Sequence, residues 1–225
     1  MPTRTNTRRP LVAGSVATTK RSTGSPRKRA NEVIEAAASV FALRGYHGAT
    51  TQEIADLLRI RQATLYYYFA SKDTALELVC QRGVEGFIER ANEVATSSGS
   101  APDKIANLIR YHLKAFEEKQ PYVKTFLNER KHLSDDARKK IGRLSRRYES
   151  IVQNVFETGV KEGSLRKDLN CRLATLGMLG VCNSAAEWYG KEPGITLVAM
   201  TKHLTQLISL GSQCNQAVQH SKSKR

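Results

Sequence analysis

The sequence predicts an all-α protein of about nine helices, with a small N-terminal part and a larger C-terminal part. Apolar residues recur at the i, i+3, i+4 spacing of amphipathic helices along most of the chain. Ser, Thr and Asp residues stand before several of these segments as N-caps. Runs of alternating β-branched residues, which would predict strands, do not compete with them.

Four helices are expected in the N-terminal half, over 30–45, 51–60, 61–68 and from the Ser71 cap to the linker 96–100. Gly45 ends the first helix. Thr50 and Glu53 form a capping box that starts the second helix, since each side chain can accept a hydrogen bond from the other's backbone amide. The C-terminal half predicts helices over 101–116, 121–127, from the Ser134 cap to Gly159 or Gly163, 171–189 and 196–210.

The chain is strongly basic. Thirty-six Lys and Arg residues against 21 Asp and Glu give a net charge of +15, which favours a polyanionic partner. Residues 1–29 hold eight basic residues and no acidic one, and they lack an apolar period. Three interpretations stay open for this arm: a contact with nucleic acid, a plain disordered extension, or an organellar transit peptide.

Several function classes have no support in the sequence. No apolar run reaches the length of about 18 residues that a membrane span needs. Cys80, Cys171, Cys182 and Cys214 are far apart, and the five histidines show no metal-ligand spacing, so we expect buried thiols in a reducing cytoplasm and no metal site. Without a nucleophile motif, a phosphate-binding loop or paired carboxylates, we expect neither an enzyme nor a cofactor.

The segment 61–69 is the strongest functional signal. Two short helices joined by a tight turn and braced by a third predict a helix-turn-helix unit, whose second helix enters the major groove of DNA. Leu65 and Phe69, four residues apart, should form its buried face, and Tyr68 belongs either to that face or to its rim. The opposite face is then free to contact DNA.

The side chains of that face suit DNA. Gln62 can pair with adenine and Arg61 with guanine, and Thr64 can meet a thymine methyl group. The hydroxyls of Tyr66 and Tyr67 suit phosphate oxygens, although a role of the tyrosines in the core and its rim is the competing interpretation. The candidate DNA-binding residues are Arg27, Thr50, Thr51, Arg61, Gln62, Ala63, Thr64, Tyr66, Tyr67 and Lys72.

A specific set of residues lies in the stretch 36–76: Phe41, Gly45-Tyr46, Ala49-Thr50-Thr51, Glu53-Ile54-Ala55, Thr64-Leu65-Tyr66-Tyr67-Tyr68-Phe69, Ser71-Lys72-Asp73 and Leu76. In order and spacing this set resembles the DNA-binding domain of the TetR family of bacterial transcriptional regulators. One position departs from the family pattern, because Arg59 stands where the family usually has Gly in the turn. A left-handed backbone at a non-glycine residue costs about 1 kcal/mol, which a fold can bear.

The resemblance implies a domain organisation and partners. It divides the chain into a disordered basic arm (1–26), a DNA-binding domain (27–87, with the helix-turn-helix at 50–69), an effector-binding and dimerisation domain (88–212) and a disordered tail (213–225). It also implies a homodimer on a palindromic double-stranded DNA operator in the bacterial cytoplasm, at the nucleoid, with no membrane contact. The small residues Gly177, Gly180, Ser184 and Ala185 agree with a close helix contact between subunits.

The family also implies a small-molecule effector in the C-terminal domain. The candidate effector-binding residues are Tyr111, His112, Phe116, Phe126, Tyr148, Phe156, Asn183, Glu187 and Trp188, although aromatic residues at helical spacing also fit a plain core. The stretch 186–194 is similar to a Trp-Tyr-x-Pro-Gly segment of regulators whose effectors are often acyl-CoA thioesters. Glu187 stands where those sequences often carry Arg, and its charge would repel a phosphate-bearing effector. A hydrophobic compound of another kind is the alternative.

Three hypotheses follow, and they can be told apart. A repressor released from its operator by an effector binds one sequence tightly and keeps most of this affinity without the arm. A nonspecific nucleic-acid-binding protein that acts through its basic arm loses binding when residues 1–25 are deleted. A helical enzyme would turn over a substrate such as a thioester.

Overall fold

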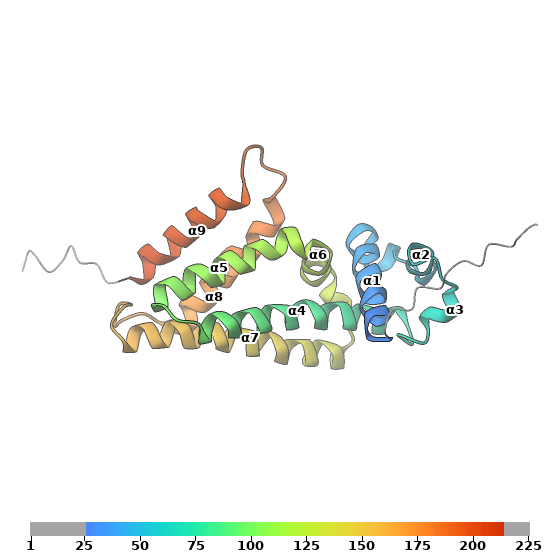
Figure 1. The fold of residues 1–225 in the computed structure, drawn as a ribbon, viewed down its shortest axis with the longest axis horizontal. Coiled ribbons are helices and arrows are strands. Elements are labelled where there is room, and N and C mark those ends of the chain that lie inside the picture. Colours follow the sequence, from blue (N-terminus) through green and yellow to red (C-terminus); the bar gives the residue numbers. More distant parts are fainter. Residues whose placement is uncertain (1–25, 214–225) are drawn as a thin grey trace, which may run out of the picture.

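The structure is a computed structural model that describes residues 26–213. The described part holds nine α-helices and one 3-10 turn (Figure 1): α1 (Pro26–Gly48), α2 (Thr51–Leu57), α3 (Gln62–Leu65), α4 (Lys72–Thr96), α5 (Ala101–Glu118), α6 (Gln120–Glu129), η1 (Arg130–His132), α7 (Asp135–Lys161), α8 (Cys171–Trp188) and α9 (Leu197–Ser212). The all-α prediction is therefore confirmed. Apart from Pro26, which already begins α1, and Gln213, the predicted arm and tail lie outside the described residues.

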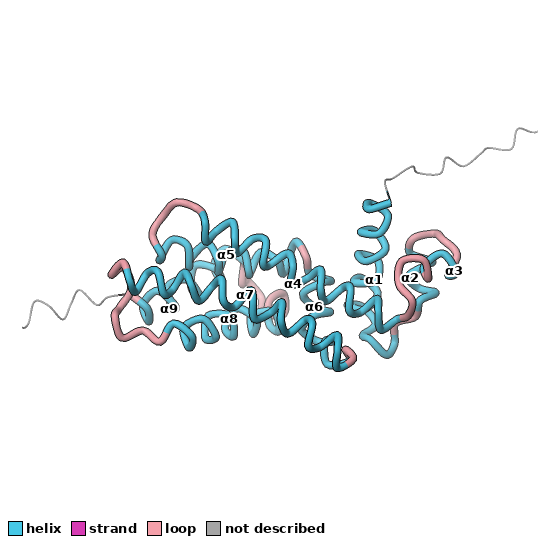
Figure 2. Tube along the Cα trace, turned by 90° about the horizontal axis from the view of Figure 1, so that it is seen from below, coloured by secondary structure: helices cyan, strands magenta, loops and turns pink. Residues whose placement is uncertain are grey.

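The helices form two groups joined by α4. Helices α1–α3 lie together at one end of the molecule in both views, and α8 and α9 lie in the other part (Figures 1 and 2). Helix α4 runs from the first group along α7 into the second, and α6 packs against α1. One continuous helix and one inter-domain contact thus connect the two groups.

Local signals set the helix starts. The capping box is present, because the Thr50 hydroxyl accepts from the Glu53 amide and the Glu53 carboxylate accepts from the Thr50 amide, both at 3.1 Å. Ser71 and Ser134 cap α4 and α7 as predicted. The helical geometry of α1 is interrupted at Gly45, whose φ of +69° is the left-handed conformation that glycine adopts without steric cost.

The turn region differs from the prediction. Helix α2 ends at Leu57 and α3 is a single turn over Gln62–Leu65, whereas the sequence predicted helices to 60 and over 61–68. The amides of Tyr67 and Tyr68 bond to carbonyls three residues back, as in a tightening last turn. This turn brings Phe69 into the core beside Leu65, and both side chains are buried.

Helices of the C-terminal group enclose a second part of the hydrophobic core. Ile105, Ile109 and Phe156 are fully buried there. Gly159 lies inside α7 rather than at its end. A Cβ at this position would come within 2.6 Å of the Ala101 Cβ, so the close contact requires glycine. Between residues 26 and 213, no helix has the length and apolar content needed to cross a membrane.

Candidate nucleic-acid interface and effector cavity

The α3 turn exposes the side chains that the sequence singled out. Arg61, Ala63 and Thr64 are exposed, and Tyr66 and Tyr67 have exposed fractions of 51% and 86%. Leu65 and Phe69 are buried beneath them, so the predicted buried face is confirmed. Tyr68 is half-buried and packs edge-on against Tyr67. The outer face of α3 is therefore accessible to the major groove of DNA.

Gln62 is less free than its neighbours. It is half-buried, and its side-chain amide donates a hydrogen bond of 2.6 Å to the Thr51 hydroxyl on α2. Pairing with adenine through both the amide nitrogen and the oxygen requires that this bond be released or shared. Thr51 thus positions Gln62 in the absence of DNA.

Lys72 stands at the start of α4, where α1, α2 and α4 meet. Its ammonium group donates to the Ala49 carbonyl at 3.1 Å and lies 4.6 Å from the centre of the Tyr46 ring. The Tyr46 hydroxyl donates to the Asp73 carboxylate, and this bond raises the pKa of Tyr46 to about 12. Thr50 and Arg27 are exposed, Arg27 in the first turn of α1.

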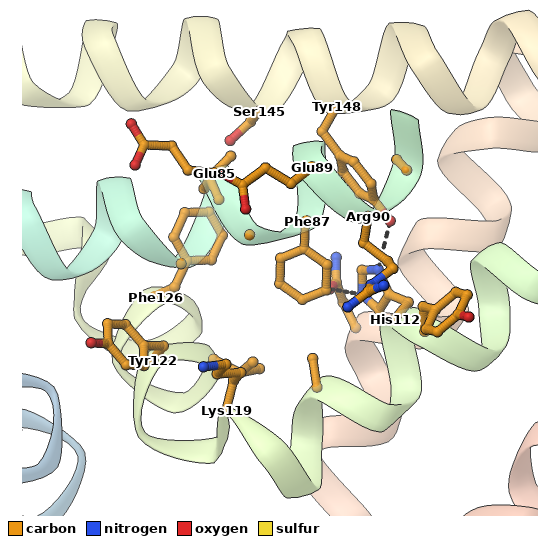
Figure 3. Close-up of a pocket in the computed structure, with 18 of the residues that line it drawn as sticks. Glu85, Phe87, Glu89, Arg90, His112, Lys119, Tyr122, Phe126, Ser145 and Tyr148 are labelled. Carbon is orange, nitrogen blue, oxygen red and sulfur yellow. Dashed lines mark hydrogen bonds between the residues drawn. The ribbon is translucent and has the colours of Figure 1, made fainter. Parts of the chain in front are cut away.

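A cavity of about 820 Å³ lies among α4, α5, α6, α7 and α8 (Figure 3). Five of the nine predicted effector-binding residues line it: Tyr111, His112, Phe126, Tyr148 and Asn183. Volumes between about 300 and 1,000 Å³ are usual for small-molecule sites. The cavity can therefore hold a sizeable organic ligand.

His112 is a buried polar residue in the wall of this cavity. One ring nitrogen lies 3.0 Å from the Tyr148 hydroxyl and the other 3.0 Å from the Asn183 amide oxygen, as the dashed lines in Figure 3 mark. Burial lowers the pKa of His112 to about 4, so the ring is neutral at pH 7. An amide oxygen only accepts, so Nε2 carries the proton and Nδ1 accepts from Tyr148. The three side chains join α5, α7 and α8.

Four predicted effector residues lie outside the cavity lining. Phe156 is fully buried in the core, and Phe116 is buried with its ring nearly perpendicular to that of His112. Glu187 is exposed and Trp188 is partly buried. Because Glu187 does not line the cavity, the expected repulsion of an anionic effector by its carboxylate has no basis in this geometry.

Sequence reasoning missed the wall that α4 contributes. Phe87 lies 4.8 Å from the His112 ring, ring centre to ring centre, and Arg90 lies over Tyr111. Gly83 and Gly86 line the cavity on the same helix and leave it open there. Two glycines three residues apart within a long helix were the available signal, because glycine is unfavourable in a helix unless space is needed.

Family comparisons agree with both halves of the fold. Residues 33–79 match the model described as bacterial regulatory proteins, tetR family, and residues 98–211 match the tetracyclin repressor-like C-terminal domain. The chain belongs to the TetR family. It is therefore a DNA-binding transcriptional regulator, from a family of regulators and not of enzymes.

Individual TetR-family relatives are distant but cover most of the chain. The transcriptional repressor KstR2 of Rhodococcus jostii is 25% identical over 181 residues, which cover 80% of this chain and 89% of that protein. FadR from Bacillus subtilis, solved in complex with stearoyl-CoA, has a TM-score of 0.70 at 24% identity and covers 79% of this chain and 96% of its own. AibR, solved with isovaleryl coenzyme A and operator DNA, has a TM-score of 0.72 at 20% identity and covers 80% and 97%.

An apolar surface lies on the last two helices of this TetR-family chain. Leu173 on α8 and Val198, Leu207 and Leu210 on α9 are all at least 60% exposed. At Gly177 and Gly180, a Cβ would meet no atom within 4 Å. Ala185 is fully buried inside the chain, so it does not belong to this face as the sequence predicted. We call Leu173, Gly177, Gly180, Val198, Leu207 and Leu210 the α8–α9 face.

The contact between α1 and α6 extends to η1 near Lys72. The Tyr46 amide donates to the Glu129 carboxylate at 2.8 Å, and the Tyr46 ring stacks on His132 at 5.1 Å. His132 also packs edge-on against His47. The last residue of α6 and the turn η1 thus hold the end of α1 beside Lys72, one of the candidate DNA-binding residues.

The described residues contain no cluster of three or more His, Cys, Asp or Glu side chains that could hold a metal ion. Cys80 and Cys182 are buried free thiols, and burial raises the pKa of each to about 12. Cys171 is half-buried, and Cys214 lies outside the described residues.

Proposed function

We propose that this regulator is a homodimeric repressor that leaves a palindromic operator when an amphipathic effector, of the acyl-CoA type, fills the 820 Å³ cavity. The observation that carries the proposal is that one helix serves both sites. Helix α4 begins at Lys72 beside the interface and contributes Phe87 and Arg90 to the cavity. A ligand that displaces the middle of α4 therefore shifts the base of the helix-turn-helix unit.

The exposed face of α3 supports DNA recognition. The side chains of Arg61, Thr64 and Tyr67 project from the molecule on a buried base of Leu65 and Phe69. Arg and Thr side chains can read base edges, and Tyr hydroxyls bond phosphate oxygens. Gln62 adds a side chain that distinguishes adenine once Thr51 releases it.

The effector class is inferred from relatives and from the cavity. Two relatives of this fold were solved with coenzyme A thioesters, one of them also with operator DNA. The cavity combines apolar walls, such as Phe87 and Phe126, with the neutral His112–Tyr148 pair. An apolar chain with a hydrogen-bonding group near its end matches this lining.

The α8–α9 face supports the homodimer. Large exposed apolar side chains on adjacent helices are costly in water unless another surface covers them. A second copy related by a two-fold axis presents the same face, and such a pair places two α3 turns for two half-sites.

The test selects bound duplexes from a random DNA library and then titrates the best one with lauroyl-CoA while fluorescence anisotropy is recorded. We expect an inverted repeat, and an operator Kd at least tenfold higher with saturating effector. Gln62→Ala should relax base preference at one position of each half-site, whereas Lys72→Ala should weaken all sequences alike. Enrichment without an inverted repeat, or operator binding that acyl-CoAs of several chain lengths leave unchanged, contradicts the proposal.

A further inference from the structure

A second, smaller hollow of about 420 Å³ adjoins the cavity and shares Phe126, Arg130, Ser145 and Glu149 with it. Its other lining residues come from η1, the following loop and α7: Lys131, Leu133, Arg138, Ile141, Gly142 and Arg146. We call these ten residues the basic vestibule. The two spaces are adjacent, because four residues line both of them.

The charges of the two spaces differ. The cavity lining holds five Lys and Arg residues and five Glu residues, so its formal charge is balanced. The basic vestibule holds four, Arg130, Lys131, Arg138 and Arg146, against Glu149 alone. Glu149 is itself paired with Arg172 of α8 at 2.7 Å. The vestibule thus has a surplus of positive charge.

Most of these positive charges are not neutralised by a carboxylate of the described residues. Within the described part of the chain, Lys131 and Arg146 have no ion-pair partner. Arg138 reaches Asp135 only at 3.9 Å and donates to the Leu133 carbonyl. The Arg130 guanidinium lies 5.1 Å from the centre of the Phe126 ring, at the boundary between the two spaces.

We propose that the basic vestibule binds the phosphate-bearing head group of the effector whose apolar chain lies in the cavity. This inference rests on the proposed function, which assigns an amphipathic ligand to the cavity. Guanidinium groups bind phosphate oxygens through paired hydrogen bonds. Four cations exceed what one carboxylate can satisfy and match a group with several negative charges, such as a pyrophosphate. Leu133 and Ile141, which are both buried, line the same hollow beside these exposed cations.

The position of the vestibule also gives it a route to the DNA-binding domain. Arg130 and Lys131 line the vestibule, while their neighbours Glu129 and His132 hold Tyr46 of α1. A head group that draws Arg130 and Lys131 toward itself therefore acts on the same turn that holds the end of α1.

The test compares two double variants of exposed arginines on α7. Arg138→Gln with Arg146→Gln removes two vestibule charges. Arg143→Gln with Arg147→Gln removes the same charge from exposed positions of α7 that line neither space, and is the matched control. Binding of lauroyl-CoA and of laurate to each full-length protein is measured by calorimetry, and binding of inorganic pyrophosphate by phosphorus NMR line broadening.

We expect the vestibule variant to bind lauroyl-CoA at least tenfold more weakly and laurate within twofold of the unmodified protein, with the control unchanged for both. Equal losses in both variants, or no loss in either, overturn the proposal. An equal loss of laurate binding assigns the vestibule to a carboxylate and also overturns it.

The pyrophosphate measurement separates this proposal from the proposed function. If neither acyl ligand binds the unmodified protein, the effector class is wrong, and pyrophosphate alone decides the vestibule. Broadening by the unmodified protein and the control but not by the vestibule variant supports an anion site. Equal broadening by all three proteins, or none, overturns it.

Discussion

Arg59 shows how one residue can depart from a family pattern and still fit. It is the one non-glycine residue between 26 and 213 with a positive φ, at +53°, and it occupies the turn between α2 and α3. The left-handed conformation expected there is confirmed. The Arg59 side chain is exposed, so the fold retains the strain without gaining buried contacts from this side chain.

We expect Arg59→Gly to raise the free energy of unfolding by up to about 1 kcal/mol, because glycine adopts a positive φ without strain. The entropy that glycine adds to the unfolded chain reduces this gain. Urea denaturation followed by circular dichroism measures this. Arg59→Val, which keeps the strain and adds β-branching, should lower the stability. A glycine variant less stable than the unmodified protein would show that Arg59 makes a stabilising interaction.

His112 gives the stability a pH dependence. Its pKa is about 4 in the folded chain and about 6.5 when unfolded, so the unfolded state takes up a proton first as the pH falls. The contribution of the neutral His112 ring to the free energy of unfolding is fully present well above pH 6.5 and is lost progressively as the pH falls toward 4. Between pH 7.5 and 5.5 we expect a loss of about 1 kcal/mol.

The variant His112→Gln isolates this contribution, since glutamine can hydrogen-bond to Tyr148 and Asn183 but does not titrate. Denaturation midpoints of both proteins at the two pH values give the comparison. If the variant loses as much stability as the unmodified protein over this interval, His112 is not the group responsible.

At the scale of the helices, sequence reasoning succeeded where the cause was local. The Thr50–Glu53 capping box fixed the start of α2, and Ser71 fixed the start of α4. It failed where tertiary packing decides. The end of α3 depends on the burial of Phe69, and no local pattern separates Phe126, which lines the cavity, from Phe156, which fills the core. The faces that enclose a cavity follow from how five helices are rotated against one another.

The contact that the end of α6 and the turn η1 make with Tyr46 should couple the cavity to the DNA-binding domain. We expect Glu129→Gln to leave the affinity for lauroyl-CoA and for free operator within about threefold, because Glu129 lines neither space and makes no part of α3. The effector should release this variant from the operator at least fivefold less well, since the charge-assisted bond to the Tyr46 amide is weakened.

Anisotropy titrations with and without lauroyl-CoA measure this coupling, and Glu162→Gln, an exposed position at the far end of α7, is the control. Normal release of the Glu129 variant would show that the signal passes through α4 alone.

For the whole molecule, the α8–α9 face should decide the assembly state. We expect Leu173→Glu with Leu207→Glu to give a monomer, since two buried carboxylates would face their own copies across a two-fold axis. Operator affinity should then fall at least a hundredfold, because each chain holds one half-site separately. Light scattering coupled to gel filtration gives the mass.

Leu43→Glu is the matched control, because Leu43 is 75% exposed on α1, away from this face. A control that also dissociates, or a double variant that stays dimeric, would place the subunit contact elsewhere.

Helix α8 alone separates the cavity from the outer surface of the subunit. Leu176, Leu179 and Asn183 line the cavity, and the same helix carries Leu173 and Gly177 on its outer side. If two copies meet at the α8–α9 face, the cavities of the two subunits are separated only by their two α8 helices. Effector binding in one cavity then changes the shape of the cavity in the other subunit, and the second effector binds with an affinity different from that of the first.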